Sequence, residues 1–512
     1  MRSEAGFDAR IDLWPARAAA TAPSSPAILF RGETWSYEAF ARRIDDLAET
    51  LEAIGLRRGD RVGWLGLNHP KVFTLLFACA RLGAVLVPFN WRLAAAELAR
   101  IAEDCGPRLI LHDDEFAHQA AALAGPGRVI AHHARAIPPL KHDPEPRAFP
   151  APDPIRGPEG FAHENGAEAP LLIVYTSGAT GRPKGAVLPV RAVAANAAMS
   201  VAAHGLTRES RALVVLPLFH VGGLNILPTP SFSIGAAVEI HERFEPAAAL
   251  AALAGGVTHA IMVPTVAQAI MAQPGWAAAD LSRLRALSIG STDVPREIID
   301  AVHARLVPMP QIYGATETGP FAIYQTVADA MENPGSIGRP GALCEIRLAR
   351  PDGSEAAPGE PGEILVKGPN ILSGYWRNEE ETARAIVDGW FHTGDIALRD
   401  EAGLFWFADR IKHVVISGGE NIYPAELERV LRPHPKVREV AVVGRPDPKW
   451  GEVPVAVIAP REPMTEAEAL SAFNGVLARY KHPRAVVFVD ALPRNAMGKV
   501  VAAEVRAMIG AG

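Results

Sequence analysis

Residues 60–90, DRVGWLGLNHPKVFTLLFACARLGAVLVPFN, carry the pattern that decides the fold. The apolar run at 60–68 predicts a strand, residues 71–83 predict a largely buried helix, and residues 84–90 predict a second strand. A further helix and strand are expected at 95–106 and 108–114. Strands that alternate with helices predict an α/β protein with a parallel sheet and helical crossovers.

The same pattern extends in both directions from this stretch. Residues 38–55 predict an amphipathic helix that ends at Gly55, and helix and strand patterns alternate again from 211 to 291. Short β-like pieces within residues 344–410 predict a small antiparallel barrel. The last hundred residues mix strands with a helix, and predict a compact α+β unit. That helix is expected to begin at the capping-box residues Thr465 and Glu468.

Composition excludes several classes of protein. The 512 residues are 49% hydrophobic and 21% charged, which is typical of a globular chain, and the net charge of −6 does not favour nucleic-acid binding. The uncharged stretches 212–238 and 246–279 contain prolines, so neither predicts a transmembrane segment, and the N-terminus lacks the apolar core of a secretory signal. Cys79, Cys105 and Cys344 lack C-x-x-C spacing and indicate reduced thiols in the cytoplasm.

The stretch YTSGATGRPKG at 175–185 raises the question of a phosphate-binding loop. Its donors are backbone N–H groups at Gly178 and Gly181, hydroxyl groups of Thr176, Ser177 and Thr180, and the ammonium of Lys184. The Walker A pattern fails, because no Gly-Lys-Ser/Thr follows at the required spacing and residues 185–189 predict a returning strand. A nucleotide-phosphate loop of another kind is favoured over a plain turn or a variant P-loop.

Four further stretches form an ordered set with this loop. They are YGATETG at 313–319, GWFHTGD at 389–395, DRIKHVVISGGENIYPAELE at 409–428 and PRNAMGK at 493–499. In this order and spacing the chain resembles the AMP-forming acyl-CoA synthetases, within the superfamily of luciferases and peptide-synthetase adenylation domains. The resemblance covers essentially the whole chain.

The resemblance implies an enzyme that joins a carboxylic acid to ATP, releases pyrophosphate and transfers the acyl group to coenzyme A. ATP, Mg²⁺ and coenzyme A are therefore the expected ligands. A carboxylate that approaches the α-phosphate is an anion meeting an anion, so the site needs cations and oriented donors.

The resemblance assigns the phosphates and the metal to two of the motifs. The expected β,γ-phosphate cradle consists of Thr176, Ser177, Gly178, Ala179, Thr180, Gly181 and Lys184, where many relatives carry a hydroxyl residue in place of Ala179. In YGATE, Tyr313 is similar to the residue that stacks on adenine, and Gly314 and Ala315 join it to Thr316, which bonds the phosphate. Glu317, together with Thr176, is expected to hold Mg²⁺.

The remaining motifs imply the ribose and transfer residues. Asp395 resembles the carboxylate that accepts both ribose hydroxyls, and Arg410 the cation beside the ribose or phosphate. Gly290, Ser291 and Thr292 lie where relatives place a segment lining adenine and substrate. Lys499 matches the lysine that bridges the carboxylate and the α-phosphate during adenylation.

The resemblance also predicts a domain that moves. Lys412 is expected to be the hinge between an N-terminal domain at 1–410 and a mobile C-terminal domain at 411–512. Rotation would withdraw Lys499 and present Ser417, Gly418 and Gly419 to the pantetheine tunnel of coenzyme A. Many relatives have aspartate at the position of His413.

His220, within PLFHVGGLN at 217–225, has two interpretations. It invites the role of a general base, but a histidine in an apolar segment is more often a packing or gating group, and relatives place an aromatic wall of the acyl pocket here. The candidate catalytic residues are thus Lys499, Thr316, Glu317 and His220. The apolar neighbours predict an acid with an apolar or aromatic tail, such as a fatty or aryl-propenoic acid.

Other functions stay open beside the acid–CoA ligase. An adenylation enzyme that loads a carrier protein and a nucleotide-binding regulator without turnover share these motifs, and so does a luciferase-type oxygenase. The expected partners are the acid, ATP and coenzyme A, with no nucleic acid. A homodimer and a monomer are both compatible with the sequence.

Overall fold

The structure is a computed structural model of the chain. It describes residues 7–125, 127–132, 166–177, 183–290, 294–417, 420–494 and 499–510, and at Ser177, Lys412 and Asn421 it describes the backbone alone. The chain divides into two compact units. The first contains Met1–Ile346 and Val366–Phe391, and the second contains Arg347–Leu365 and His392–Gly512.

The stretch that decides the fold forms the centre of a seven-stranded sheet. Strand β3 (Arg61–Leu65) and strand β4 (Val85–Pro88) are parallel and entirely buried, and α3 (Pro70–Leu82) connects them. The predicted strand–helix–strand unit is confirmed. The strand order is β18-β8-β7-β4-β3-β5-β6. The other strands of this sheet are β5 (Leu109–His112), β6 (Val129–His132), β7 (Pro170–Ser177), β8 (Pro183–Pro189) and β18 (Gly374–Tyr375). The predicted helix before β5 is α4 (Ala95–Cys105).

A second, nine-stranded sheet holds the segments between 211 and 291. Its order is β15-β14-β13-β12-β11-β9-β10-β1-β2, with parallel pairs from β1 to β13 and antiparallel pairs at both ends. The predicted second α/β layer is therefore present. Its strands are β1 (Pro26–Phe30), β2 (Glu33–Ser36), β9 (Arg211–Val214), β10 (Ala237–Ile240), β11 (His259–Met262), β12 (Ala286–Gly290), β13 (Gln311–Tyr313), β14 (Ile323–Tyr324) and β15 (Arg339–Pro340).

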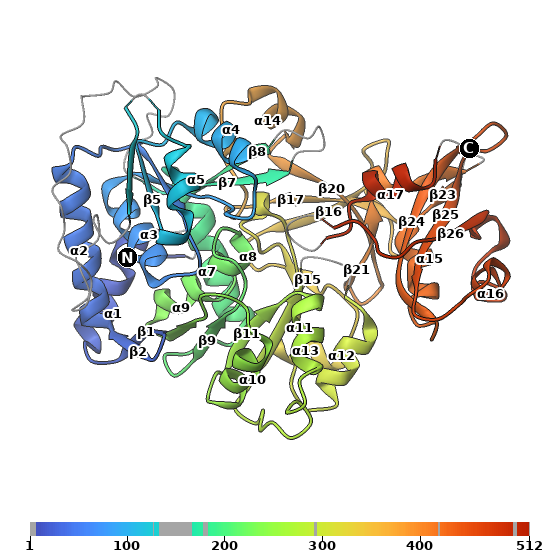
Figure 1. Cartoon of the computed structure of the whole chain (residues 1–512), viewed down its shortest axis with the longest axis horizontal. Coiled ribbons are helices and arrows are strands. Elements are labelled where there is room, and N and C mark those ends of the chain that lie inside the picture. The colour runs from blue at the N-terminus through green and yellow to red at the C-terminus, as the bar shows by residue number, and fades with distance from the viewer. Residues whose placement is uncertain are drawn as a thin grey trace. The chain divides into compact units, whose positions relative to one another are not determined.

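Helices of the first unit pack through aromatic side chains. Phe232 of α9 (Pro228–Ile234) contacts Phe40 of α2 and Phe73 and Phe77 of α3, with ring centroids 5.1–5.8 Å apart. Figure 1 shows α1 packed on α2, and α2 beside β1. The helices not yet given bounds are α1 (Trp14–Thr21), α2 (Tyr37–Ala53), α5 (Ala117–Ala121), α7 (Val190–His204), α8 (Val221–Asn225), α10 (Pro246–Ala254), α11 (Pro264–Met271), α12 (Arg296–His303), α13 (Val327–Glu332) and α14 (Glu379–Ala385).

The β-rich segment predicted at 344–410 forms short strands. The division between the two units falls within β16, β17 and β20, and β20 pairs with β21 in antiparallel fashion. The strands are β16 (Glu345–Ala349), β17 (Gly362–Lys367), β19 (Ile386–Val387), β20 (Trp390–Arg399) and β21 (Phe405–Arg410).

The end of the chain folds as the predicted α+β unit. Its sheet has the order β23-β22-β25-β24, with β26 also paired to β25. Successive residues of β24 face opposite sides: Val440 and Val442 pack with Leu427 of α15, whereas Ala441 packs with Val505 of α17. The elements are β22 (Val415–Ser417), β23 (Glu420–Ile422), α15 (Pro424–Leu431), β24 (Val437–Asp447), β25 (Gly451–Pro460), α16 (Glu466–Ser471), β26 (Ala485–Phe488) and α17 (Ala502–Met508).

Local predictions can be compared directly with these elements. The helix expected at 38–55 is α2, which ends at Ala53, two residues early, and Gly55 adopts a left-handed φ of 85°. The capping box at α16 is confirmed, because Thr465 and Glu468 each accept a hydrogen bond from the backbone N–H of the other. In the part of the chain that the structure describes, no helix combines the length and apolar character needed to cross a membrane. The mixed α/β fold with a large N-terminal and a small C-terminal part is as predicted.

A buried histidine cluster lies between α7 and the nine-stranded sheet. His204 is 2% exposed, its Nε2 lies 2.9 Å from Ser288 Oγ, and its carbonyl oxygen is 3.1 Å from His259 Nε2. Burial, and then the neighbouring His259, lowers the pKa of His204 to about 3. Burial also lowers the pKa of His259 to about 4, so both histidines are neutral in the folded protein at neutral pH.

Acid is expected to destabilise the protein through this cluster. An unfolded histidine with a pKa of about 6.5 binds a proton that buried His204 does not, so stability falls as pH decreases below that value. Between pH 6.5 and about 5 the loss for one such group approaches about 2 kcal/mol. Urea unfolding of wild type and His204→Gln at several pH values measures it, with exposed His118→Gln as the control. Equal pH dependence in wild type and His204→Gln would contradict the expectation.

Candidate active site

Three of the predicted phosphate-loop residues lie on the paired strands β7 and β8: Thr176 and Ser177 on β7, and Lys184 on β8. Thr176 and Lys184 face each other across the two strands, and the Thr176 hydroxyl lies 3.5 Å from the carbonyl oxygen of Lys184. The returning strand expected after Lys184 is confirmed as β8. Gly178, Ala179, Thr180 and Gly181 lie outside the described residues, as does the side chain of Ser177.

The YGATE motif begins at the end of β13 and continues into a single helical turn, η3 (Thr316–Thr318). A Cβ atom at Gly314 would lie 1.7 Å from the carbonyl oxygen of Pro320, so only glycine fits this close passage. The Thr318 hydroxyl accepts a hydrogen bond of 2.9 Å from the backbone N–H of Ala315. These contacts fix the backbone on either side of Glu317.

Tyr375 connects the two motifs. Its hydroxyl donates a hydrogen bond of 2.9 Å to Glu317 Oε1, and the ammonium of Lys184 lies 5.6 Å from the centroid of its ring. Lys184 also forms an ion pair with Glu381. The predicted phosphate-binding lysine and the predicted metal-binding glutamate therefore lie around one tyrosine of the first unit.

Tyr375 and Glu381 are missing from the sequence-based set of candidates. They belong to GYWRNEEE at 374–381, where the acidic residues after Asn378 predict only a helix N-terminus. No signal in the sequence connects this segment to the loop at 175–185. The connection comes from β18, whose residue Tyr375 pairs with Ala186 of β8.

In the second unit, Asp395 and Arg410 face each other across β20 and β21. Arg410 Nε lies 3.0 Å from Asp395 Oδ1, and the Asp395 side chain is 8% exposed. The Asp395 backbone N–H donates to the Thr393 hydroxyl, which itself donates to the Ile364 carbonyl oxygen at 2.8 Å. The carboxylate predicted to bind ribose thus has a fixed backbone and an adjacent cation.

Lys499 belongs to the same group. Partial burial, and then the positive charge of Arg410, lowers its pKa to about 8, although Asp395 opposes this shift. Residues 495–498 lie outside the described part, and Arg494 and Val500 on either side of them form an antiparallel β-bridge. The structure therefore brings Lys499 into the electrostatic environment of the predicted ribose-binding residues.

The other predicted residues are scattered over both units. Gly290 ends β12, and a Cβ there would lie 2.4 Å from the carbonyl oxygen of Ile312, whereas Ser291 and Thr292 lie outside the described residues. Ser417 ends β22 opposite Glu420, and Gly418 and Gly419 also lie outside. Their predicted roles stay predictions.

Lys412 lies in the single-turn helix η4 (Ile411–His413), inside the second unit. His413 Nδ1 is 3.6 Å from the carboxylate of Asp409, which is buried and also accepts a hydrogen bond from the backbone N–H of Ala425. His413 therefore has an acidic neighbour in its own segment. The predicted hinge role of Lys412 stays a prediction.

His220 immediately precedes α8 and contacts aromatic rings. Its ring centroid lies 4.5 Å from that of Phe219, whose ring is in turn 6.1 Å from Trp91 in an edge-on arrangement. The predicted role of His220 stays a prediction. The rings form an aromatic group, Trp91–Phe219–His220, within the first unit.

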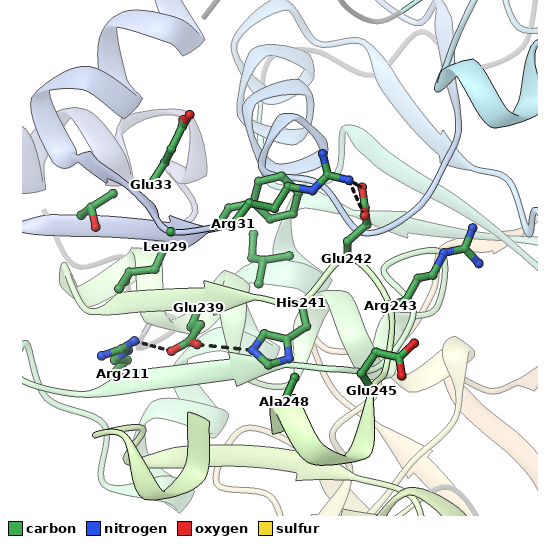
Figure 2. Close-up of a pocket in the computed structure, with 14 residues that line it drawn as sticks. Leu29, Arg31, Glu33, Arg211, Glu239, His241, Glu242, Arg243, Glu245 and Ala248 are labelled. Atoms are coloured by element: carbon green, nitrogen blue, oxygen red, sulfur yellow. Dashed lines mark hydrogen bonds and ion pairs between the residues drawn. The ribbon is translucent and has the colours of Figure 1, made fainter. Parts of the chain in front are cut away.

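A cavity of about 550 Å³ lies elsewhere in the first unit, along β1, β2 and β10 (Figure 2). Several of its charges pair with one another: Arg31 contacts Glu242 at 2.7 Å, and Glu239 contacts both Arg211 and His241. Burial acts to raise the pKa of Glu239, but His241 and Arg211 hold it below its usual value. None of the predicted site residues lines this cavity, so it is separate from the candidate active site.

Comparison with known proteins defines the class of protein. A model of the AMP-binding enzyme family matches residues 15–376, and a model of the AMP-binding enzyme C-terminal domain matches residues 426–499. The chain belongs to the AMP-binding enzyme family. It is an ATP-dependent acid–CoA ligase of the AMP-forming acid–thiol class, as the motifs predicted.

Individual relatives match over nearly their full length. The chain is 42% identical to indoleacetate–CoA ligase from Aromatoleum aromaticum, over 97% of each chain, and 41% identical to feruloyl-CoA synthase from an Amycolatopsis species, over 97% of this chain and 98% of the relative. It also resembles the structure of o-succinylbenzoate coenzyme A synthetase from Bacillus subtilis in complex with ATP and magnesium ion. That match has a TM-score of 0.84 and 30% identity, and covers 96% of this chain and 99% of the other.

Proposed function

We propose that this ligase activates carboxylic acids with an aromatic tail, of the arylacetic or aryl-propenoic kind, and transfers them to coenzyme A. The observation that carries the nucleotide chemistry is the grouping of Lys184 and Glu317 around Tyr375. The aromatic group Trp91–Phe219–His220 and the names of the two relatives above support the choice of acid. A medium-chain fatty acid is the second candidate, because the neighbours of His220 are apolar.

The proposed reaction has two steps. A carboxylate oxygen of the acid attacks the α-phosphorus of ATP, the bond from that phosphorus to the bridging oxygen breaks, and pyrophosphate leaves. The thiol sulfur of coenzyme A then attacks the carbonyl carbon of the acyl-adenylate, AMP leaves with the bonding electrons, and the thiol proton passes to solvent. Both steps bring negatively charged groups together, so cations around the phosphates are the main requirement.

The described residues fit Mg²⁺ and a triphosphate. Magnesium usually binds one or two protein oxygens together with substrate phosphates, and Glu317 and Thr176 supply such oxygens. The described residues contain no cluster of three or more His, Cys, Asp or Glu that could hold a metal by itself. Bound Mg²⁺ would supply positive charge to the phosphates. Lys184 would bind the β- and γ-phosphate oxygens, and Thr316 a phosphate oxygen.

The second unit would supply the ribose and transfer groups. We assign the ribose hydroxyls to Asp395, which Arg410 holds in place through the 3.0 Å ion pair. Lys499 would donate hydrogen bonds to the carboxylate and the α-phosphate. For the thioester step we propose that residues 411–512 rotate about Lys412 relative to residues 1–410, which would bring residues 417–419 to the pantetheine chain.

The choice of acid is tested with a substrate panel. Each buried CH₂ contributes about 0.8 kcal/mol, so four additional methylenes should raise kcat/KM about 200-fold over acetate. We expect indole-3-acetate and ferulate to be used best, octanoate next, and acetate and malonate least. Pyrophosphate release with saturating ATP and coenzyme A measures the order. Acetate as the preferred acid would overturn the proposal.

Two alternatives from the sequence are separated by the same assay. A carrier-protein-loading enzyme would release pyrophosphate in a single burst, and the addition of coenzyme A would not lead to continuous release. A regulator would bind ATP but would show no acid-dependent exchange of pyrophosphate. Continuous turnover that requires coenzyme A supports the ligase.

The proposal includes a cytoplasmic location and a possible dimer as hypotheses. The three cysteines are buried free thiols, which suits a reducing compartment. Sedimentation of the purified protein tests the homodimer against the monomer.

A further inference from the structure

Lys184 has a partner that none of the sequence motifs contains. Its ammonium forms an ion pair with the Glu381 carboxylate, although the two residues are 197 positions apart. The two side chains are 17% and 24% exposed, so much of the pair is shielded from solvent. Arg384 contacts the other carboxylate oxygen of Glu381 at 3.2 Å.

Rigid elements build this contact. Tyr375 pairs with Ala186 next to the phosphate-loop hairpin, and the backbone N–H of Trp376 donates to the Gly185 carbonyl oxygen at 2.7 Å. The following helix α14 begins at a cap in which the Asn378 side chain accepts a hydrogen bond from the backbone N–H of Glu381. The position of Glu381 beside Lys184 is therefore set by backbone contacts.

Tyr375 is fixed in the same way. Its backbone N–H donates to the Thr382 hydroxyl at 2.8 Å, and its phenol hydroxyl donates to Glu317. Glu317 is thereby bound to the tyrosine hydroxyl, while Lys184 is paired with Glu381. The predicted phosphate-binding cation Lys184 thus has a full negative charge as its partner.

We infer that Glu381 is a positioning residue: it acts as the counter-ion of Lys184, holds the ammonium in place and weakens the binding of ATP. This inference rests on the proposed role of Lys184 at the phosphates. A triphosphate that binds Lys184 must displace Glu381 or bind beside it, and a carboxylate near phosphate oxygens opposes them electrostatically. Removal of the charge should therefore tighten ATP binding. Since partly exposed ion pairs have modest strength, we expect a change of about three- to tenfold.

The test compares Glu381→Gln with Glu380→Gln. Glu380 lies on the same helix and pairs with Arg384, and its side chain is 75% exposed, so its substitution removes an equal charge outside the contact with Lys184. Calorimetric titration with ATP and MgCl₂ in the absence of acid gives the Kd. We expect Glu381→Gln to lower the Kd and the KM for ATP about three- to tenfold, with kcat and the KM for the acid nearly unchanged. Glu380→Gln should match wild type.

A double-mutant cycle separates this inference from the proposed function. In the Lys184→Ala background, Glu381→Gln should no longer tighten ATP binding by the same factor, because its partner is absent. If Lys184→Ala weakens ATP binding but Glu381→Gln leaves the Kd unchanged or raises it, the counter-ion role is wrong while the phosphate role stands. If Lys184→Ala leaves ATP binding unchanged, the phosphate role itself is wrong. Thermal unfolding of the ligand-free variants checks that each is folded.

Discussion

Lys499→Ala is expected to lower the rate of acyl-adenylate formation by at least about 100-fold, and thioester formation from a supplied acyl-adenylate by no more than several-fold. The loss of one preorganised donor to a developing charge typically costs roughly 10²–10³ in rate. The ammonium would act only while the carboxylate and the α-phosphate meet, so the second half-reaction should not need it. Acid-dependent exchange of labelled pyrophosphate into ATP measures the first step.

The surroundings of Lys499 add a pH dependence to this expectation. Partial burial, and then the positive charge of Arg410, lowers its pKa to about 8, so the ammonium is present below that value and is lost as pH rises through it. Exchange catalysed by the free enzyme should decline above about pH 8. Lys499→Arg keeps its charge in this range, and any activity that it retains should lack this alkaline decline.

Lys436→Ala provides a matched control. Lys436 also lies in the C-terminal part, but it pairs with Glu468 of α16 at 2.7 Å and belongs to none of the motifs. Its substitution should leave both half-reactions close to wild type. An equal loss of both half-reactions in Lys499→Ala would mean that this lysine stabilises the fold and does not act in adenylation.

Features that depend on neighbouring residues could be predicted from the sequence. The unit β3-α3-β4 follows from alternating apolar runs, and the β7–β8 hairpin follows from glycines and a proline between two apolar segments. Thr465 and Glu468 satisfy each other's backbone N–H groups within one turn, so the start of α16 needs no tertiary information. Helix α2 ends two residues earlier than predicted, since terminal turns depend on the structure that follows.

Contacts between distant strands could not be predicted in this way. Asp395 and Arg410 were both expected to bind nucleotide, but their direct pairing depends on the register of β20 against β21, which shifts by one residue between Ile396 and Ala397. Glu381 reaches Lys184 only because β18 joins the edge of β8. A helix-capping pattern in the sequence says nothing about the strand to which the helix becomes attached.

Lys412→Pro is expected to have the opposite effect to Lys499→Ala: it should spare acyl-adenylate formation and lower thioester formation. The resemblance to acyl-CoA synthetases predicts rotation of the C-terminal domain about Lys412, which requires a change in the φ and ψ angles of this residue. Proline fixes φ near −65°, a value that a 3₁₀ turn such as η4 already uses, so this turn itself should persist. A rotated arrangement that needs a different φ would be penalised by about 3 kcal/mol, or roughly 100-fold in rate.

Pyrophosphate exchange should therefore survive in Lys412→Pro while transfer to coenzyme A is lost, as measured by thioester formation from a supplied acyl-adenylate. Lys412→Ala is the matched control, because it removes the same side chain without restricting φ, and it should keep both activities. If both variants lose transfer, the Lys412 side chain matters and its backbone does not. If both variants keep transfer, the hinge must lie at another residue.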